Sequence, residues 1–245
     1  MLSDLAVAAR KSGLKVVAVP GWVTRTRPAS TGTFAPRGIL CHHTGDATDG
    51  LGYAVWLARD GRADLPAPLC QLSLGRDGTV YVIAAGRANH AGQAKASGPM
   101  PAGDGNTLYI GIEAQNTGSE GWTDTQRDAY VRLCAALCEH YGWPATHVRG
   151  HKETSVTGKW DPGAIDMSTF RNDVAAAMAV RTLEDDMPLT DADVQKVAAA
   201  AAKALLNYEI DDRDASGHVT GKTTVRHQLE RIETFLQRAD DAPKA

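Results

Sequence analysis

The chain has 245 residues, of which 43% are hydrophobic and 22% charged, an ordinary composition for a globular protein. This length allows one medium-sized domain with a sizeable core and a small appendage. The formal net charge of −3 gives no general attraction to nucleic acid, so a nucleic-acid partner is not expected.

The first part of the chain is predicted to contain two short strands and one helix. Residues 15–19 suit a short strand or an extended arm. Residues 20–37 are rich in Pro, Gly, Thr and Arg, and are expected to be irregular surface chain. Residues 38–42 form a short, continuously apolar run, which is typical of a buried strand, and residues 51–59 suit a short helix.

A β-hairpin is predicted in the segment that follows. Asp77-Gly78 separates two apolar runs, residues 69–74 and 79–84, and this dipeptide favours a tight turn between strands. Residues 91–106 are rich in Gly, Pro and Ala and are expected to form a long loop, which in a compact domain often lines a site. Residues 107–113 are predicted to form the next strand.

The clearest helix is predicted over residues 125–141. Its apolar positions recur every three or four residues, and Gly142 marks its end. Residues 145–167 are expected to be irregular. A further helix is predicted from about 169 to 181, with Ser168 as its N-cap.

Cysteines and apolar runs indicate neither a disulfide scaffold nor a membrane span. Four cysteines are too few for such a scaffold, and Cys134 and Cys138 are expected to pack as buried thiols on one helix face. No apolar stretch approaches the roughly 18 residues of a transmembrane helix, so membrane insertion is not expected. Met1–Leu5 lacks a basic leader before an apolar core, so no signal peptide is predicted.

The C-terminal part is predicted to be a separate, mainly helical region. Residues 182–189 are the linker candidate, which leaves residues 1–181 as the main domain and residues 190–245 as a small second region. Thr190 and Asp193 resemble a capping box that opens an alanine-rich helix ending near residue 207.

A second amphipathic helix, or a short coiled-coil seam, is predicted from apolar residues spaced by four, three and four. These are Val225, Leu229, Ile232 and Leu236. Residues 182–245 contain 8 Lys+Arg and 13 Asp+Glu, a net charge of −5, which disfavours simple attraction to anionic polymers. The region is therefore expected either to bind a specific ligand or to form a homo-oligomer.

Two histidines stand at the end of the predicted strand 38–42. His42 and His43 follow an apolar run, and a strand fixes the direction of the ring that it carries. Since neighbouring side chains of a strand point to opposite sides, only one of the pair should face a site. A histidine at a strand end can equally be an ordinary polar residue.

A second polar cluster comes just before Pro162-Gly163. The chain between His151 and Asp161 is long enough to fold back, so that both side chains reach one metal ion. Lys159 and Asp161 alternate with Trp160, so extended chain would place both on one side. The simpler alternative is a surface ion pair between Lys159 and Asp161, which contributes little stability.

Glu113 lies at the end of an apolar strand. A carboxylate there is costly unless it is paired or points to water from an edge strand. If it faces a pocket, it can act as a proton acceptor. His90 precedes the long loop and is expected either to contact a substrate or to be solvated at a loop tip.

Taken together, these segments resemble the zinc-dependent N-acetylmuramoyl-L-alanine amidases, which include phage lysozymes of the amidase type and animal peptidoglycan recognition proteins. The resemblance covers about residues 20–180 and keeps the order of the family motifs. The matching stretches are Ile39-Leu40-Cys41-His42-His43-Thr44, Asp77-Gly78-Thr79-Val80-Tyr81, Asn89-His90-Ala91-Gly92, Ile110-Gly111-Ile112-Glu113 and Gly150-His151 with Lys159 and Asp161-Pro162-Gly163.

The resemblance implies a zinc site and a fold. It makes His42, His151 and Asp161 the ligands of Zn²⁺, with Glu113 as the general base and Lys159 as the group that stabilises the oxyanion. The remaining candidates, which the resemblance leaves as substrate contacts, are His90, Thr44 and His43. The implied fold is mixed α/β, with a central mixed β-sheet flanked by helices and zinc in a surface groove.

The implied activity is hydrolysis of the amide that joins N-acetylmuramic acid to L-alanine in peptidoglycan. Without an export signal, two enzymes fit: a phage endolysin and a muropeptide-recycling amidase. The endolysin waits in the host bacterial cytoplasm for release by a holin-type partner, and the separate C-terminal region favours it. A non-catalytic peptidoglycan-binding protein is the third alternative, disfavoured because every ligand and catalytic residue is kept.

Overall fold

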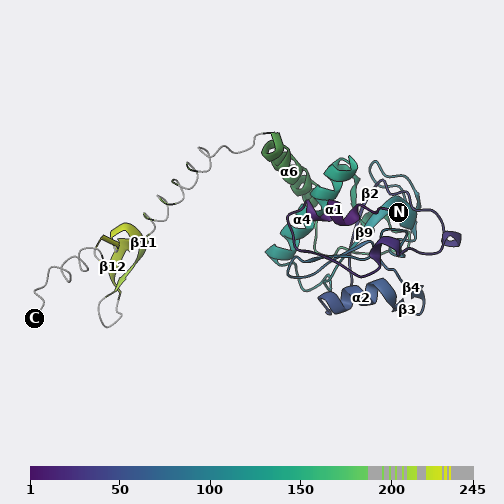
Figure 1. Ribbon diagram of the computed structural model, residues 1–245, viewed down its shortest axis with the longest axis horizontal. Helices are drawn as coiled ribbons and strands as arrows, with labels where there is room; N and C mark the ends of the chain where they lie inside the picture. The colour runs from purple at the N-terminus through teal and green to yellow at the C-terminus, as the bar shows by residue number, and fades with distance from the viewer. Residues whose placement is uncertain are drawn as a thin grey trace, which may run out of the picture. The chain divides into compact units, whose positions relative to one another are not determined.

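The structure is a computed structural model that describes residues 1–186, 209–213 and 219–227, and the single residues 195, 199, 202, 206, 229, 230 and 232. The chain divides into two compact units, Met1–Thr182 and Leu183–Ala245 (Figure 1). Among the described residues, no helix is both long enough and apolar enough to cross a membrane.

A six-stranded mixed sheet forms the centre of the first unit, in the order β1-β6-β5-β9-β2-β10. Only the β5–β6 pair is antiparallel, and the other four pairs are parallel. The strands are β1 (Val16–Ala18), β2 (Gly38–His43), β5 (Leu72–Leu74), β6 (Val80–Val82), β9 (Tyr109–Ala114) and β10 (Val148–Gly150). The predicted fold class, a central mixed sheet flanked by helices, is confirmed.

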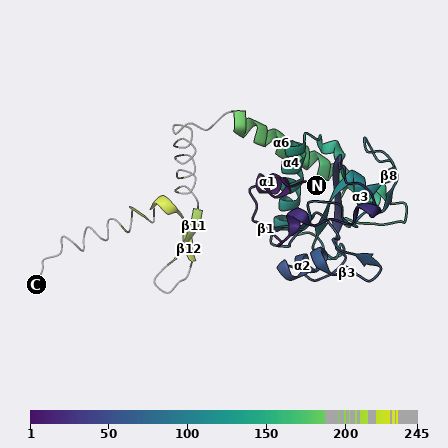
Figure 2. The same cartoon turned by 45° about the vertical axis from the view of Figure 1, so that its right-hand side comes forward.

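Helices cover both faces of this sheet (Figures 1 and 2). One face packs against α1 (Leu5–Arg10), α4 (Asp124–Tyr141) and the start of α6 (Met167–Asp186), in the largest apolar cluster. The other face packs against α2 (Leu51–Arg59) through Ala54, Leu57 and Ala58. The neighbouring strands β2 and β9 are also buried on both sides, because Leu40 and Tyr109 pack against Ala94 and Met100 on the face opposite the largest cluster, which explains their mostly apolar sequences.

Helix α4 fixes the two strands that matter most for the site. The Oγ1 atom of Thr123 accepts the N–H of Gln126 at 3.1 Å and caps the helix, while Gly142 ends it at φ +69°. Tyr130 is fully buried, and its hydroxyl accepts the N–H of His42 at 2.9 Å. The same hydroxyl lies 3.0 Å from the carbonyl of Ile112, so it ties β2 to β9.

Short elements connect and flank the strands of the sheet. They are the two-stranded pairs β3 (Gly61–Arg62) with β4 (Leu65–Pro66) and β7 (Gln93–Ala94) with β8 (Gly103–Asp104), the one-turn helices α3 (Gly105–Leu108) and α5 (His151–Thr154), and the 3₁₀ turns at Trp22–Thr24, Ala29–Thr31 and Ala145–His147. None of these short elements was predicted.

The longer elements match the sequence predictions well, with three exceptions. The predicted hairpin is the antiparallel pair β5–β6, and the helices predicted at 51–59 and 125–141 are α2 and α4. In contrast, α1 was not predicted at all. Residues 145–167, expected to be irregular, contain strand β10 and helix α5. Helix α6 continues to Asp186, so residues 182–186 of the predicted linker are helical, and residues 187–189 lie outside the described residues.

The described part of the second unit contains an antiparallel ribbon, β11 (Glu209–Arg213) with β12 (Val219–Thr224). This ribbon was not predicted, because the prediction relied on the apolar spacing around it and overlooked the β-branched run in β12. Residues 195, 199, 202 and 206 are helical, as are residues 225–227, 229, 230 and 232. Three residues named in the sequence predictions, Thr190, Asp193 and Leu236, lie outside the described residues.

Candidate metal centre

Three neighbouring parallel strands deliver the polar residues to one edge of the sheet. His42 is the last residue but one of β2, and it lies directly opposite Glu113 on β9. His151 is the first residue of α5, immediately after β10, which pairs with β2 on its other side. Because parallel strands end at the same edge of a sheet, residues far apart in the chain come together here.

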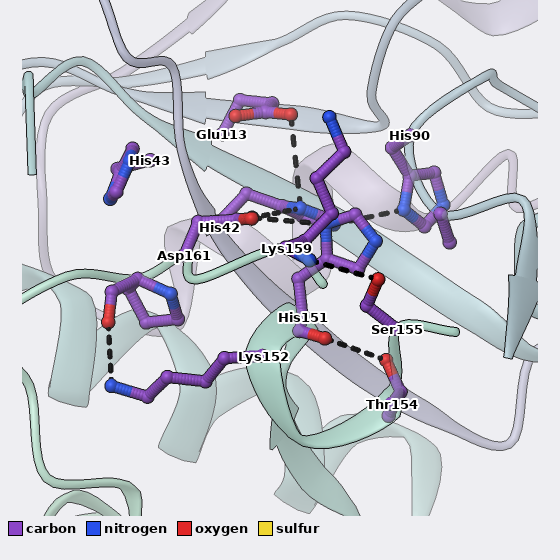
Figure 3. Close-up of polar contacts among 12 residues, drawn as sticks. His42, His43, His90, Glu113, His151, Lys152, Thr154, Ser155, Lys159 and Asp161 are labelled. Carbon is purple, nitrogen blue, oxygen red and sulfur yellow. Dashed lines mark hydrogen bonds and ion pairs between the residues drawn. The ribbon is translucent and has the colours of Figure 1, made fainter. Parts of the chain in front are cut away.

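His42, His151 and Asp161 converge on one point (Figure 3). The Oδ2 atom of Asp161 lies 2.8 Å from Nδ1 of His42 and 3.1 Å from Nδ1 of His151. One potential ligand atom from each residue lies within 4.8 Å of the other two. All three residues are buried, with exposed fractions of 1% for His42, 5% for His151 and 8% for Asp161.

The donor set fits zinc. Two imidazole nitrogens and one carboxylate oxygen are ligands that catalytic zinc sites use, with a fourth position left for water. With metal–ligand bonds of about 2.0–2.2 Å, ligand atoms on a tetrahedron lie about 3.3–3.6 Å apart. The contacts of Asp161 Oδ2 with the two imidazoles, 2.8 and 3.1 Å, are slightly shorter, so a small outward movement would admit the ion.

The electrostatics favour the protonation states that bind metal. Burial lowers the pKa of His42 to about 4, although the hydrogen bond to Asp161 opposes this shift. Burial would raise the pKa of Asp161, but hydrogen bonds with His151 and His42 outweigh it and hold that pKa below its ordinary value. A neutral imidazole and an ionised carboxylate are the forms that coordinate a metal ion.

Glu113 borders the centre without joining the ligand set. Its Oε1 lies 3.9 Å from Nδ1 of His42, and its Oε2 is buried without a hydrogen-bond partner in the described part of the chain. Burial, followed by the nearby charge of Asp161, raises the pKa of Glu113 well above its ordinary value, and Lys159 opposes this shift. A carboxyl with a raised pKa in a pocket suits proton transfer near neutral pH.

A cavity of about 440 Å³ opens at the centre. Lys159 is exposed and lines this cavity, and its backbone N–H donates to Oγ of Ser155 at 3.2 Å. Besides the site residues, the cavity is lined by α2, the β3–β4 pair and the segment around His90; these residues are Tyr53, Trp56, Leu57, Arg62, Asp64, Leu65, Leu69, Asn89, Ala91, Gly92, Asn106 and Thr157.

The two adjacent histidines face different partners, as strand alternation predicted. His42 points to Asp161, whereas Nδ1 of His43 accepts the backbone N–H of Gly163 at 2.9 Å. The His43 ring also packs edge-on against Trp160, with ring centroids 4.3 Å apart. His43 therefore braces the loop that carries Asp161, although it also borders the cavity.

The other two predicted substrate contacts also reach the cavity. The hydroxyl of Thr44 lies 3.4 Å from the carbonyl of Asn116, and Thr44 is half-buried. His90 is buried, and its Nδ1 lies 3.1 Å from Nε2 of His42. The structure thus brings every predicted site residue to one cavity, and among the described residues the three predicted to bind zinc form the group that could hold a metal ion.

Two supporting residues were missed by sequence reasoning. The Nζ atom of Lys152 donates to the carbonyls of Pro162 and Ile165, at 2.8 and 2.5 Å, and so holds the loop after Asp161. Glu153 accepts the backbone N–H of Gly150 at 2.8 Å, just where α5 begins. Lys152 gave no signal in the sequence, but a glutamate three residues after a helix start is a known capping signature.

The family model for N-acetylmuramoyl-L-alanine amidases matches residues 32–164, more than half of the chain. The chain belongs to this amidase family. Every candidate site residue, from His42 to Asp161, lies within the matched segment. The predicted resemblance to N-acetylmuramoyl-L-alanine amidases is therefore confirmed at the level of the family, while the second unit lies outside the match.

Two curated amidases are similar in sequence to part of this chain. The 1,6-anhydro-N-acetylmuramyl-L-alanine amidase AmpD of Enterobacter cloacae is 36% identical over 98 residues, 39% of this chain and 51% of that protein. AmpD of Escherichia coli strain K12 is 34% identical over 99 residues, 39% of this chain and 52% of that protein. The chain thus spans about half the length of the curated relatives it matches.

Solved structures resemble the first unit, Met1–Thr182, which we call the amidase unit, at low sequence identity. A selenomethionine derivative of AmpD is 23% identical, with a TM-score of 0.46 over 65% of this chain and 93% of that one. PlyL is 18% identical, with a TM-score of 0.48 over 66% of this chain and 96% of the PlyL chain. The N-acetylmuramoyl-L-alanine amidase LysC from Clostridium intestinale URNW is 18% identical, with a TM-score of 0.47 over 65% and 97%.

Proposed function

We propose that this family member is a zinc-dependent amidase of peptidoglycan. It hydrolyses the amide between the lactyl group of N-acetylmuramic acid and the L-alanine of the stem peptide. The observation that carries the proposal is the convergence of His42, His151 and Asp161 within 4.8 Å, in a cavity that Glu113 and Lys159 also line. Zn²⁺ bound by these three ligands would supply a Lewis acid and lower the pKa of a water at the open position.

Glu113 supplies the proton transfers. Its carboxylate accepts the proton of the attacking water, and the resulting acid returns that proton to the departing alanine nitrogen as the amide C–N bond breaks. The buried Oε2, which has no hydrogen-bond partner among the described residues, is available for this exchange. A raised pKa makes the protonated form accessible, so the same group can act in both steps.

Lys159 supplies positive charge in the cavity where the reacting carbonyl would lie. It lines the cavity together with Asp161, and its charge opposes the rise that burial and Asp161 cause in the pKa of Glu113. A cation at this place stabilises the oxyanion that develops during attack on the lactyl carbonyl. The partly exposed position leaves the ammonium group free to follow the substrate as it enters.

We further propose that the enzyme works as an endolysin, released from the host cytoplasm to cut the cell wall. The support is the compact second unit beyond the amidase unit, since a wall-degrading enzyme gains from a second contact with its insoluble substrate. The curated relatives favour a second candidate, because both are named as amidases of 1,6-anhydro-muropeptides, which are soluble fragments.

The decisive test is product analysis on two substrates. The purified chain is incubated with intact sacculi and with a soluble anhydro-muropeptide, with and without a chelator, and products are identified by mass spectrometry. New L-alanine amino termini that vanish with chelator and return with zinc are expected. His42→Ala should abolish stable zinc binding; wall clearance by this variant after chelation would refute the metal assignment.

The relative rates choose between the candidates. Turnover of sacculi supports the endolysin, whereas turnover confined to the soluble fragment supports recycling. Bound zinc with no new amino termini on either substrate would instead indicate a non-catalytic peptidoglycan-binding protein.

A further inference from the structure

The second ring nitrogen of His42 faces another histidine. While Nδ1 of His42 points to Asp161, its Nε2 lies 3.1 Å from Nδ1 of His90. The two rings meet edge-to-face, with centroids 5.2 Å apart and an interplanar angle of 84°. Figure 3 shows His42 between Asp161 on one side and His90 on the other.

Ligation of a metal ion fixes the direction of this contact. A histidine that binds through Nδ1 has no proton on that atom, so a neutral His42 carries its proton on Nε2. That N–H then donates to Nδ1 of His90, which must be the unprotonated nitrogen of its own ring. Histidines that bind metal ions usually donate their other N–H to an acceptor, and this donation sets the ring orientation.

His90 is itself held firmly from two directions. The Oδ1 atom of Asn106 accepts the backbone N–H groups of His90 and Ala91, at 2.9 and 2.8 Å, which fixes the chain that carries the ring. The ring lies flush against Gly111 of β9, where an added Cβ would come within 2.6 Å of ring atoms. A rigid acceptor is what a metal ligand needs for a single orientation.

The position of His90 suits a hydrogen-bond acceptor for His42 better than it suits the predicted contact with a substrate. His90 borders the cavity, but only 9% of the residue is exposed, and its Nε2 is buried. Its other ring nitrogen, Nδ1, is occupied by His42. Nε2 has no hydrogen-bond partner among the described residues, but its burial keeps it out of reach of a substrate that enters the cavity.

We propose that His90 is a positioning residue that orients His42 for zinc by accepting the proton of its Nε2. This proposal rests on the zinc-dependent function proposed above. It replaces the expectation of a substrate contact with a role in metal binding, and it extends the site by one histidine that does not coordinate the ion.

Two substitutions of similar shape isolate the acceptor. In His90→Asn, the side-chain amide can place its oxygen near the position of Nδ1 and accept the same hydrogen bond. In His90→Leu, a methyl group takes that place and cannot accept. Both side chains leave a similar gap where the rest of the imidazole was, so their difference reports the hydrogen bond. His147→Ala is the control, because His147 bonds the carbonyl of Arg37 and does not line the cavity.

Zinc affinity of the full-length chain is measured by competition with a chromophoric chelator, and the thermal unfolding midpoint is measured without metal. His90→Leu is expected to bind zinc about 10–100-fold more weakly, with His90→Asn recovering most of that loss and His147→Ala unchanged. Equal zinc affinities for His90→Leu and the parent chain would overturn the proposal, as would a raised KM with unchanged zinc affinity, the mark of a substrate contact.

The comparison between the Asn and Leu variants also excludes a merely structural effect. If both lose the same affinity, the loss comes from the missing ring and the hydrogen bond is unimportant, which overturns the proposal. Failure of the parent chain to bind zinc would instead reject the proposed function itself, so the two failures are distinguishable.

Discussion

Lys152 and Lys159, which lie in the same segment, have different roles. Lys152 is half-buried, and its ammonium group donates to two backbone carbonyls in the loop after Asp161, at 2.8 and 2.5 Å. Lys159 is exposed and lines the cavity beside Glu113. The first lysine therefore holds the loop, and the second is placed to act on a substrate.

Replacing each lysine by methionine should separate these roles. Lys159→Met should lower kcat by about 10²–10³-fold and leave the unfolding midpoint unchanged, because it removes charge only at the reacting carbonyl. Lys152→Met should cost about 1–3 kcal/mol of stability, because two carbonyls lose a charged donor. Steady-state kinetics and urea unfolding measure both effects, and a normal kcat for Lys159→Met would remove that residue from the mechanism.

Glu113 should be essential for turnover but not for zinc binding. Glu113→Gln keeps the size of the side chain and removes its ability to take a proton, so kcat should fall about 10²–10⁴-fold. Zinc content, measured by atomic absorption, should stay at one ion per chain. Glu120→Gln is the matched control, since that carboxylate pairs with Arg76 outside the cavity. Loss of zinc from Glu113→Gln would show that Glu113 is a ligand.

At the scale of elements, helix α5 sets the position of His151. Glu153 accepts the N–H of Gly150 at the start of this helix, and also bonds Arg149 at 2.7 Å and Arg171 at 2.9 Å. All three charged side chains are largely buried. The one-turn helix is too short to be stable alone, so this network is what fixes the His151 backbone.

Removing Glu153 should therefore weaken both the fold and the metal site. Glu153→Ala leaves two partly buried guanidinium groups and one helix N–H without this partner, and should cost about 2–4 kcal/mol. Glu153→Gln, which can still accept the N–H of Gly150, should cost less. Zinc affinity should fall about 10-fold in the alanine variant as His151 loses its support.

A surface pair provides the control for this experiment. Asp173→Ala breaks the exposed contact with Arg127 and should cost at most about 1 kcal/mol without changing zinc affinity. If Glu153→Ala behaves like Asp173→Ala in urea unfolding and in zinc titration, the network does not position His151.

The sequence predicted elements whose apolar pattern is long or whose turn is distinctive. Helix α4 has a regular three- and four-residue spacing, and Asp77-Gly78 marks the β5–β6 hairpin. Strand β10 was missed because its three residues include Arg149 and Gly150, so no apolar run marks it. Its strand character comes from pairing with β2, which is a long-range contact.

The candidate site was easier to predict for the ligands than for their supports. His42, His151 and Asp161 are recognisable as residue types and through the family resemblance, and the structure brings them together. The roles of His43 and His90 depend on which ring atom meets which partner, at 2.9 and 3.1 Å. Such contacts join segments far apart in the chain, and no local pattern reports them.

At the scale of the whole molecule, the two compact units suggest a division of labour. Every candidate site residue lies in Met1–Thr182, whereas Leu183–Ala245 lies outside the segment that matches the family. If the second unit holds the enzyme on the wall, it raises the local substrate concentration without touching the chemistry. It should then matter for an insoluble substrate and not for a soluble one.

A shortened chain ending at Asp186, the last residue of α6, tests this division. It should hydrolyse a soluble muropeptide within about threefold of the full chain, because the metal centre and its cavity are complete. On sacculi it should lose about 10²-fold or more, the scale of a lost second binding contact. Pull-down with sacculi and light scattering, run on both chains, distinguish wall binding from oligomer formation. Equal rates on sacculi for the two chains, with unchanged pull-down and light scattering, would show that residues 187–245 serve neither purpose, and would remove the support that the second unit gives to the endolysin role.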